Sequence, residues 1–393
     1  MSLNLNFNLK IYAPVEQVYR AFTNATILRQ WFCDFATVEA KPGGRIYLWW
    51  HSGRYLVGEF VEAVINKSFK ISCRGCHEGG SSEIAAVMQV KDKVTHIRLT
   101  ESGLTNQKVS KEVQKRWEKS LMNLKSYLED GLDLRFINRP MLGILFGDFN
   151  EKIASELGVP VKEGIRLTDV VKGLGAEKAG LKKDDVIVEI GGVKTTDFSS
   201  LVNVLQHKTA GDMVDVIIYR GKEKLKLPME LSKRPTPKVA KSPKALAGEI
   251  MKKYDEINKS LAACYKGISE DQAARPPKKG EWSANEVLAH LIHTERGWQD
   301  WISDMISYQE RISDGYGDNI PARIRATVEV FGTSKELLKE LKNTQMETIK
   351  FIANLPPKIA ENKGMFWLMA YNMTQFATHT EEHIEQIRSA LKK

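Results

Sequence analysis

Two histidines stand four residues apart near the end of the 393-residue chain, at His379 and His383. The apolar residues around them, from Met369 to Ile387, recur at the spacing of one helix face. Side chains four apart on a helix lie one turn apart, with roughly 5–6 Å between their Cβ atoms, so both imidazoles could bind one ion. His290, far upstream, could supply a third ligand. The alternative interpretation is that both histidines are polar residues on the flank of a helix whose apolar stripe is simply core.

The elements that must position these histidines are predicted helices in residues 245–393. Ser283 and Glu286 form a capping box, which predicts that the helix carrying His290 begins at Ser283. Apolar periodicity predicts one helix before it, a third helix over about 334–355, and a last helix that carries the two C-terminal histidines. Four helices with longish connections predict an all-α four-helix bundle.

This C-terminal segment resembles the DinB-like superfamily. The likeness is carried by Trp282–Ser283, by the run from Glu286 to Leu291, and by the His-x-x-x-His pair with Ile384 and Gln386. In that family three histidines, one from the second helix and two from the last, bind a divalent ion in the bundle core. The resemblance implies that His290, His379 and His383 bind a divalent metal ion, zinc or nickel. His293, one turn away on a neighbouring face, is the rival for the place of His290.

Three neutral imidazoles would leave a coordination position open, which is the layout of a catalytic rather than a closed structural site. The ion could then lower the pKa of a bound water or thiol. Some members of the resembled family are S-transferases for low-molecular-weight thiols, so a metal-dependent thiol S-transferase is one alternative function. Helical proximity makes Glu286, Glu382 and Thr294 candidate hydrogen-bond partners of the ligands. The competing interpretation is that the three histidines form a structural or vestigial site that catalyses no reaction.

The first segment, residues 1–132, reads as a strand, short helices, antiparallel strands and a long helix. A curved sheet on a long helix can enclose an apolar ligand cavity, here expected at Trp31, Trp117 and Leu121. The segment resembles the SRPBCC (START-like) superfamily, and more narrowly its branch related to the activator of Hsp90 ATPase. The stretches that carry the likeness are Ala13–Tyr19, Trp31–Phe32, Lys41–Arg45 and Trp117–Leu121. The resemblance implies a helix-grip fold with a cavity for an apolar small molecule, and no fixed catalytic set.

Cys73, Cys76 and His77 have the spacing of a c-type haem attachment site. That chemistry normally belongs to exported proteins, whereas the first ten residues alternate like a strand rather than forming a secretory signal. Haem is therefore not expected, and a zinc or redox role for the cysteine pair competes with two half-buried residues at a strand end. Four scattered cysteines and the lack of a long apolar run predict a cytoplasmic protein without a membrane span.

Glycines punctuate the second segment, residues 136–232, where apolar alternation predicts strands, short helices and a final hairpin. The run Ala176–Ile187 resembles a PDZ domain of the bacterial HtrA type. The resemblance implies a loop whose backbone amides bind the terminal carboxylate of a peptide, which adds as a strand beside it. The peptide-binding residues implied are Met141, Leu142, Gly143, Ile144, Leu201 and Leu205. HtrA proteins join this module to a serine protease, but neither Gly-x-Ser-x-Gly nor Gly-Asn-Ser-Gly-Gly occurs, so protease activity is not expected.

Residues 233–244 form a Pro/Lys-rich linker that is expected to be extended and semi-stiff. The chain has a net charge of +9, and five of its basic residues lie in this linker. Because no basic stripe interleaved with aromatics appears elsewhere, nucleic-acid binding is not expected. A hydrophobic content of 42% is ordinary for a globular protein long enough for several domains.

The expected fold class is thus multidomain α+β, with a helix-grip domain, a β-rich PDZ domain and an all-α bundle. Two recognition modules beside one potential reaction centre favour a cytoplasmic binding protein with three sites, for an apolar ligand, a peptide C-terminus and a divalent ion. The thiol S-transferase is the first alternative. A chaperone-linked adaptor, suggested by the first two segments together, is the second.

Overall fold

The structure is a computed structural model of the chain, and it describes residues 3–74, 80–205, 208–309 and 319–392. The chain divides into two compact units, one of Met1–Asp133 with Lys238–Lys393 and the other of Leu134–Pro237. The fold class is multidomain α+β with antiparallel sheets, as the sequence predicts. Among the described residues, no helix is long and apolar enough to cross a membrane.

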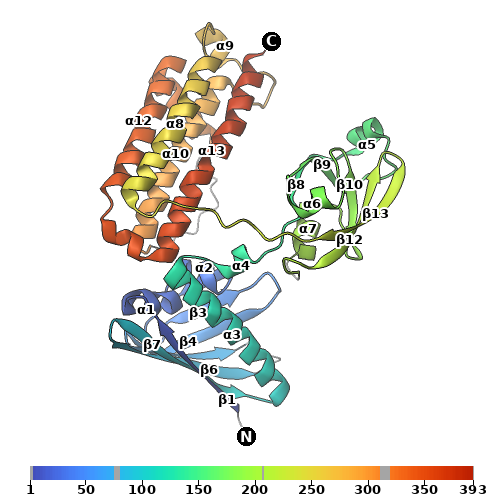
Figure 1. The fold of residues 1–393 in the computed structure, drawn as a ribbon. Helices are drawn as coiled ribbons and strands as arrows, with labels where there is room; N and C mark the ends of the chain where they lie inside the picture. Colours follow the sequence, from blue (N-terminus) through green and yellow to red (C-terminus); the bar gives the residue numbers. More distant parts are fainter. Residues whose placement is uncertain (1–2, 75–79, 206–207, 310–318, 393) are drawn as a thin grey trace. The chain divides into compact units, whose positions relative to one another are not determined.

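A seven-stranded antiparallel sheet packs against a long helix in the first part of the chain (Figure 1). The order across the sheet is β1-β7-β6-β5-β4-β3-β2. The strands are β1 (Leu3–Ile11), β2 (Phe35–Val38), β3 (Arg45–Trp49), β4 (Tyr55–Val64), β5 (Ser68–Arg74), β6 (Ser81–Lys91) and β7 (Val94–Leu104). The helices are α1 (Val15–Thr23), α2 (Ala25–Trp31) and α3 (Gln107–Asp130).

Local sequence explains both partners of this packing. Along β1, partly buried and exposed residues alternate, so its apolar side chains share one face of the sheet. α3 begins at Asn106, whose side chain accepts the amide hydrogen of Val109, and ends at Gly131 in the left-handed conformation. The buried face of α3, including Trp117 and Leu121, joins the inner face of the sheet in one hydrophobic core.

The unit Leu134–Pro237 contains a second antiparallel sheet in the order β13-β12-β10-β9-β8, with β11 paired to β10. Its strands are β8 (Ile144–Gly147), β9 (Ile165–Val170), β10 (Val186–Ile190), β11 (Val193–Lys194), β12 (Met213–Arg220) and β13 (Glu223–Glu230). Its helices are α4 (Leu134–Ile137), α5 (Glu151–Leu157), α6 (Gly175–Lys178) and α7 (Phe198–Leu205). β8 is an edge strand, so one side of its backbone is not paired within this sheet.

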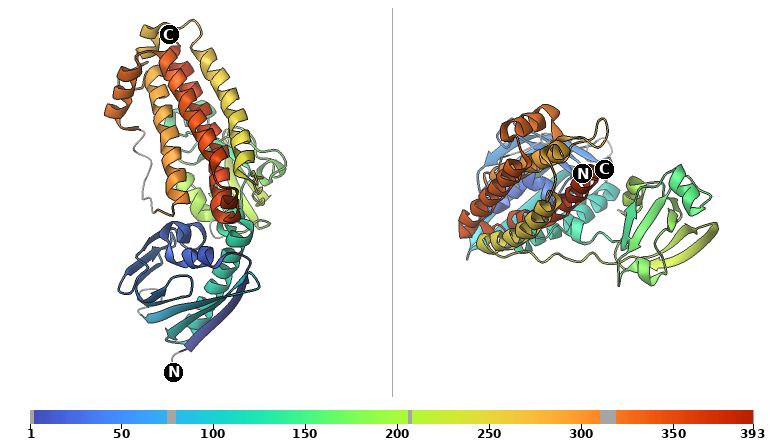
Figure 2. Two further views of the ribbon diagram at one scale, coloured as in Figure 1. Left: turned by 90° about the vertical axis from the view of Figure 1, so that its left-hand side faces the viewer. Right: turned by 90° about the horizontal axis from the view of Figure 1, so that it is seen from above.

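Four long helices run side by side in the C-terminal part (Figures 1 and 2). They are α8 (Pro243–Cys264), α10 (Ala284–Ile306), α12 (Ser334–Asn354) and α13 (Lys363–Leu391). The shorter α9 (Glu270–Ala274), α11 (Pro321–Phe331) and the 3-10 turn η2 (Pro357–Glu361) lie in the connections. The capping box of Ser283 and Glu286 starts α10, as the sequence predicts. α11 is an additional helix that the sequence analysis did not predict.

Candidate functional site

Three histidines from two helices of the bundle come together. His290 lies on α10, and His379 and His383 lie on α13. One ligand nitrogen from each ring lies within 4.8 Å of those of the other two. The ring centroids of His290 and His383 are 4.6 Å apart, and those of His379 and His383 are 4.5 Å apart. The spacing of four residues on α13 and the packing of α13 against α10 therefore produce a single cluster of imidazoles.

The cluster fits a divalent ion with a preference for nitrogen ligands. Two nitrogens that share an ion, with bonds of about 2.0–2.1 Å, lie roughly 3–4 Å apart, so small ring rotations bring three such donors onto one centre. His290 is only 4% exposed, while His379 and His383 are half-buried. The site is thus held by a buried ligand on one side and opens toward the face of α13.

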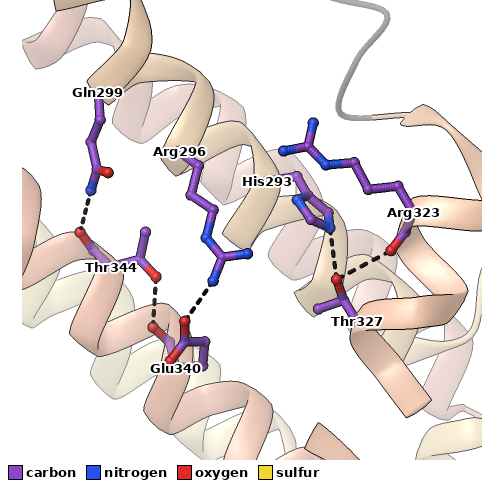
Figure 3. A network of polar contacts seen from close by, with 7 residues as sticks. All are labelled: His293, Arg296, Gln299, Arg323, Thr327, Glu340 and Thr344. Carbon is purple, nitrogen blue, oxygen red and sulfur yellow. Dashed lines mark hydrogen bonds and ion pairs between the residues drawn. The ribbon is translucent and has the colours of Figure 1, made fainter. Parts of the chain in front are cut away.

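His293, the second candidate on α10, is directed elsewhere. Its ring faces Thr327 of α11 (Figure 3), and its Nε2 lies 2.8 Å from Oγ1 of that residue. Burial, and after it the charges of Arg323 and Arg296, lower the pKa of His293 to about 4. Among the described residues its Nδ1 has no hydrogen-bond partner. His293 is therefore a neutral, buried residue of the α10–α11 contact, and the triad contains His290 in its place.

One hydrogen bond orients a ring of the triad. Nδ1 of His383 lies 2.7 Å from Oε1 of Gln386, one turn later on α13. Because an amide oxygen only accepts, Nδ1 carries the hydrogen and Nε2 is left as the ligand atom. The sequence analysis missed this partner, although Gln386 follows His383 at the spacing of helical neighbours.

The three residues that the sequence analysis named as candidate hydrogen-bond partners of the histidines differ in what they contact. Glu286 accepts the amide hydrogen of Ser283 at 2.7 Å, which occupies it in the helix cap. Thr294 donates its hydroxyl to the carbonyl oxygen of His290 at 3.0 Å, and the same Oγ1 lies 3.4 Å from the Nε2 of that ring. Glu382 is exposed. Thr294 is thus the one of the three that contacts a ligand.

A pocket of about 440 Å³ adjoins the triad. It is lined by residues before α10 and by the last turns of α13, namely Pro277, Gly280, Glu281, Trp282, Gln386, Ser389 and Ala390. Two of these residues touch the histidines, because the ring centroid of Trp282 lies 5.0 Å from that of His290 and Gln386 bonds His383. A small molecule in this pocket would therefore lie next to the three histidines.

The core of the bundle also holds a buried carboxyl group. Glu295 on α10 is 0% exposed, and both of its oxygens lie 2.9 Å from the hydroxyl of Tyr254 on α8. Burial raises the pKa of Glu295 to about 7, while hydrogen bonds from Thr348 and Tyr254 oppose that rise. The sequence analysis did not single out this group, because a single Glu in an amphipathic helix usually faces solvent.

The helix-grip part contains a small cavity. Its volume is about 30 Å³, and it is lined by Phe32, Trp50, Arg54, Tyr55, Leu56, Ile84, Glu101, Arg116, Trp117 and Ser120. Of the three residues named from the sequence, Trp117 is in that lining and Trp31 and Leu121 are not, although all three are buried in the same core. Buried Glu101 accepts hydrogen bonds from Nε1 of Trp117 at 2.6 Å and from Ser82 at 2.9 Å.

The conformation of the loop before β8 depends on a glycine and on a backbone tie to Ser232. Gly143 has φ +82°, and a Cβ there would lie 2.4 Å from the Cβ of Leu174, so only glycine fits. Met141 exchanges two backbone hydrogen bonds of 2.9 Å with Ser232, which ties down the start of the loop. In the described part of the chain, the amides of Leu142 and Gly143 have no backbone acceptor.

The predicted side-chain wall of the peptide site lies in the same core cluster as the loop. Leu201 of α7 is 4% exposed and packs with Leu142, while Leu205 and Ile144 are partly buried against this cluster. The exposed apolar side chains of α7 are instead Phe198 and Val202. The exposed apolar side chains of β8 are Leu145 and Phe146, on either side of a break in the register between β8 and β9.

The structure describes only part of the Cys-x-x-Cys-His stretch. Cys73 is buried at the end of β5, in the core beneath the sheet. Cys76 and His77 lie outside the described residues.

Comparison with known proteins gives three family matches in succession. Residues 12–129 match the family described as activator of Hsp90 ATPase homolog 1-like protein, residues 140–231 match the PDZ domain, and residues 253–387 match the DinB superfamily. The chain is built from these three domains in this order.

Curated relatives share only a quarter of their length with this chain. A probable periplasmic serine endoprotease DegP-like from Marinomonas sp. is 32% identical over 104 residues, which is 26% of this chain and 22% of the relative. The serine protease Do-like HtrA of Bacillus subtilis is 34% identical over 114 residues, covering 26% of this chain and 25% of the relative.

Solved structures resemble about a third of the chain. An HSP90 activator from Plasmodium falciparum is 24% identical, with a TM-score of 0.29, and covers 32% of this chain and 96% of its own. The Aha1 dimer from Colwellia psychrerythraea is 22% identical, with a TM-score of 0.30 and the same coverage of both chains.

Proposed function

We propose that the chain is a multidomain binding protein whose DinB-like domain binds a divalent ion, zinc or nickel, through His290, His379 and His383. The observation that carries the proposal is that ligand nitrogens of all three rings lie within 4.8 Å of one another. The PDZ domain binds polypeptide C-termini, and the helix-grip domain takes a small ligand. The protein is placed in the cytoplasm, because four scattered cysteines are typical of a reducing compartment.

Elemental analysis tests the ion directly. The full chain, purified without chelators, is expected to contain close to one zinc or nickel ion per molecule, and a variant with all three histidines replaced by alanine is expected to contain none. Equal metal content in both proteins would contradict the proposal.

Gln386 is the residue that supports the ion without touching it. Gln386→Ala removes the acceptor of the Nδ1 hydrogen of His383, so the ring loses its fixed tautomer and orientation. We expect zinc affinity to fall by about 10–100-fold, as measured by competition with a chromogenic chelator. Ser389→Ala is the matched control, because Ser389 lines the same pocket and has no contact with the triad in the described structure. If Ser389→Ala weakened zinc binding as much as Gln386→Ala, the shape of the pocket and not the tautomer of His383 would determine the affinity.

A metal-dependent transferase is the second candidate function, and the pocket beside the triad favours it. When bound, a zinc ion can lower the pKa of a water or thiol and so supply a nucleophile at neutral pH. The chain's own residues would hold the second substrate, because Trp282 and Gln386 line the pocket and touch the histidines. Turnover of an electrophilic acceptor by a low-molecular-weight thiol, lost with the three histidines, tests this candidate.

Peptide binding by the PDZ domain depends on the shape of the loop at Gly143. Gly143→Ala places a Cβ 2.4 Å from Leu174 at positive φ, so the loop must move and its amides lose their direction. We expect the variant to lose binding of peptides with free C-termini on a peptide array. Gly221→Ala is the matched control, since that glycine also has positive φ but open space around it. Undiminished binding by Gly143→Ala would contradict the assignment of this loop.

A further inference from the structure

A buried nitrogen atom without a hydrogen-bond partner lies beside two arginines at the α10–α11 contact. His293 is 4% exposed, and among the described residues its Nδ1 has no partner. Figure 3 shows the guanidinium groups of Arg296 and Arg323 on the side of the ring away from Thr327. Both positive charges act on the ring, since both lower its pKa. Because a buried polar atom normally has a hydrogen-bond partner, an unpartnered one beside two cations is a candidate ligand-binding atom.

The hydrogen bonds of Thr327 decide which nitrogen of His293 carries the hydrogen. The hydroxyl of Thr327 donates its single hydrogen to the carbonyl oxygen of Arg323, 3.1 Å away. Its Oγ1 must therefore accept a hydrogen bond from Nε2 of His293, at 2.8 Å. Since the lowered pKa keeps the ring neutral, Nδ1 carries no hydrogen and presents a lone pair. A ligand that meets Nδ1 has to donate a hydrogen bond to it.

The two guanidinium groups require the opposite property of a ligand. A guanidinium only donates hydrogen bonds, and it pairs best with an oxyanion. Arg323 is exposed, and Arg296 is half-buried and also pairs with Glu340 at 2.7 Å. A ligand that satisfies all three side chains therefore offers negative oxygens to the arginines and a hydrogen to Nδ1. Inorganic phosphate has both at neutral pH, whereas sulfate and carboxylates have no hydrogen to donate.

We propose that His293, Arg296 and Arg323 form a binding site for inorganic phosphate. The phosphate accepts hydrogen bonds from the two guanidinium groups and donates its own hydrogen to Nδ1 of His293. Because Nδ1 is buried, the exposed side chain of Arg323 moves aside to admit the anion and then closes over it. This site is separate from the triad, since His293 contacts α11 whereas His290 meets the two histidines of α13, and so it goes beyond the proposed function.

Equilibrium dialysis of the full chain against radiolabelled inorganic phosphate tests the proposal. The chain is first freed of metal with a chelator, so that phosphate cannot bind to an ion on the triad. We expect one phosphate per chain, which sulfate displaces about tenfold less effectively than unlabelled phosphate does. Arg323→Gln removes a charged donor at an exposed position and should weaken binding roughly 10–100-fold.

Arg325→Gln is the matched control. Arg325 is also exposed on α11, but it lies about 200° further round the helix, so this variant should bind phosphate like the wild-type chain. Absence of phosphate binding by the metal-free chain, or equal losses in Arg323→Gln and Arg325→Gln, would overturn the proposal.

Thr327→Val tests the role of the tautomer. Valine keeps the shape of the side chain but cannot accept from Nε2, so the hydrogen of the ring is free to move to Nδ1, which then donates. In this variant sulfate should displace labelled phosphate about as effectively as unlabelled phosphate does. A preference for phosphate that survives Thr327→Val, or equal competition by sulfate in the wild-type chain, would overturn the assignment of Nδ1 as the acceptor that selects phosphate.

Discussion

Alanine in place of any one of His290, His379 or His383 is expected to weaken zinc binding by roughly a hundredfold or more. Each substitution removes one of only three nitrogen donors, and losing even an outer hydrogen-bond partner of a ligand typically costs about 10–100-fold. The three single variants should therefore resemble one another, because the rings act on one centre. Competition with a chromogenic chelator measures the affinities.

His293→Gln is the control for that series. A glutamine amide can keep a hydrogen bond to Thr327, so the α10–α11 contact is retained while an imidazole is lost from the same helix. Wild-type zinc affinity is expected for this variant. If His293→Gln weakened binding as much as His290→Ala, the ion would not be held by the triad that the structure brings together.

The same series has a second readout in stability. An ion that binds only the folded bundle adds about 2.7 kcal/mol to the free energy of unfolding when its free concentration is 100 times its dissociation constant. Addition of zinc should therefore raise the thermal midpoint of the wild-type chain and of His293→Gln. The His290→Ala variant should respond far less at that concentration, because a site weakened a hundredfold is only half occupied and adds about 0.4 kcal/mol.

The elements that set the site could be predicted because their signals are local. On any helix, residues four apart such as His379 and His383 lie one turn apart. The capping box of Ser283 and Glu286 starts α10 through local hydrogen bonds alone, whatever packs against the helix. The order of strands, short helices and long helix in the first segment follows in the same way from alternation and helical periodicity. None of these signals depends on which elements become neighbours.

What the sequence left open depends on packing between distant segments. His290 and His293 are three residues apart on α10. His290 joins the triad because α13 packs beside it, whereas His293 contacts Thr327 because α11 packs beside it. Likewise, Leu201 and Phe198 both look apolar in the sequence, but Leu201 packs into the PDZ core while Phe198 meets Phe146 from another strand. Helical periodicity gives the face of a helix and does not say what covers it.

Glu295 is the clearest case of a residue whose burial depends on packing between distant helices, and its burial leads to a prediction about pH. Its carboxyl group is buried among α8, α10 and α12, and burial raises the pKa to about 7 from an ordinary value of 4.5. Between these two values the folded chain binds a proton that the unfolded chain has released. The free energy of unfolding should therefore fall as pH rises through this window, by an amount on the order of 3 kcal/mol at completion, and change no further above it.

Glu295→Gln is expected to remove this dependence. The amide keeps the shape of the side chain and can accept from Tyr254, but it has no proton to lose. From about pH 5 to about pH 8, the variant should gain roughly 3 kcal/mol relative to the wild-type chain, so it is the more stable protein at the higher pH. Chemical denaturation followed by helical circular dichroism at both pH values measures the difference.

Two further variants separate burial from the hydrogen bond. Tyr254→Phe removes the donor that stabilises the carboxylate, so it should raise the pKa of Glu295 further and extend the loss of stability to higher pH rather than abolish it. Glu347→Gln, at an exposed position of α12, should leave the pH dependence as it is in the wild-type chain. A pH dependence that survives Glu295→Gln unchanged would mean that the proton is taken up elsewhere and that this carboxyl group is ionised in the core, where Tyr254 and Thr348 would then have to stabilise its full charge.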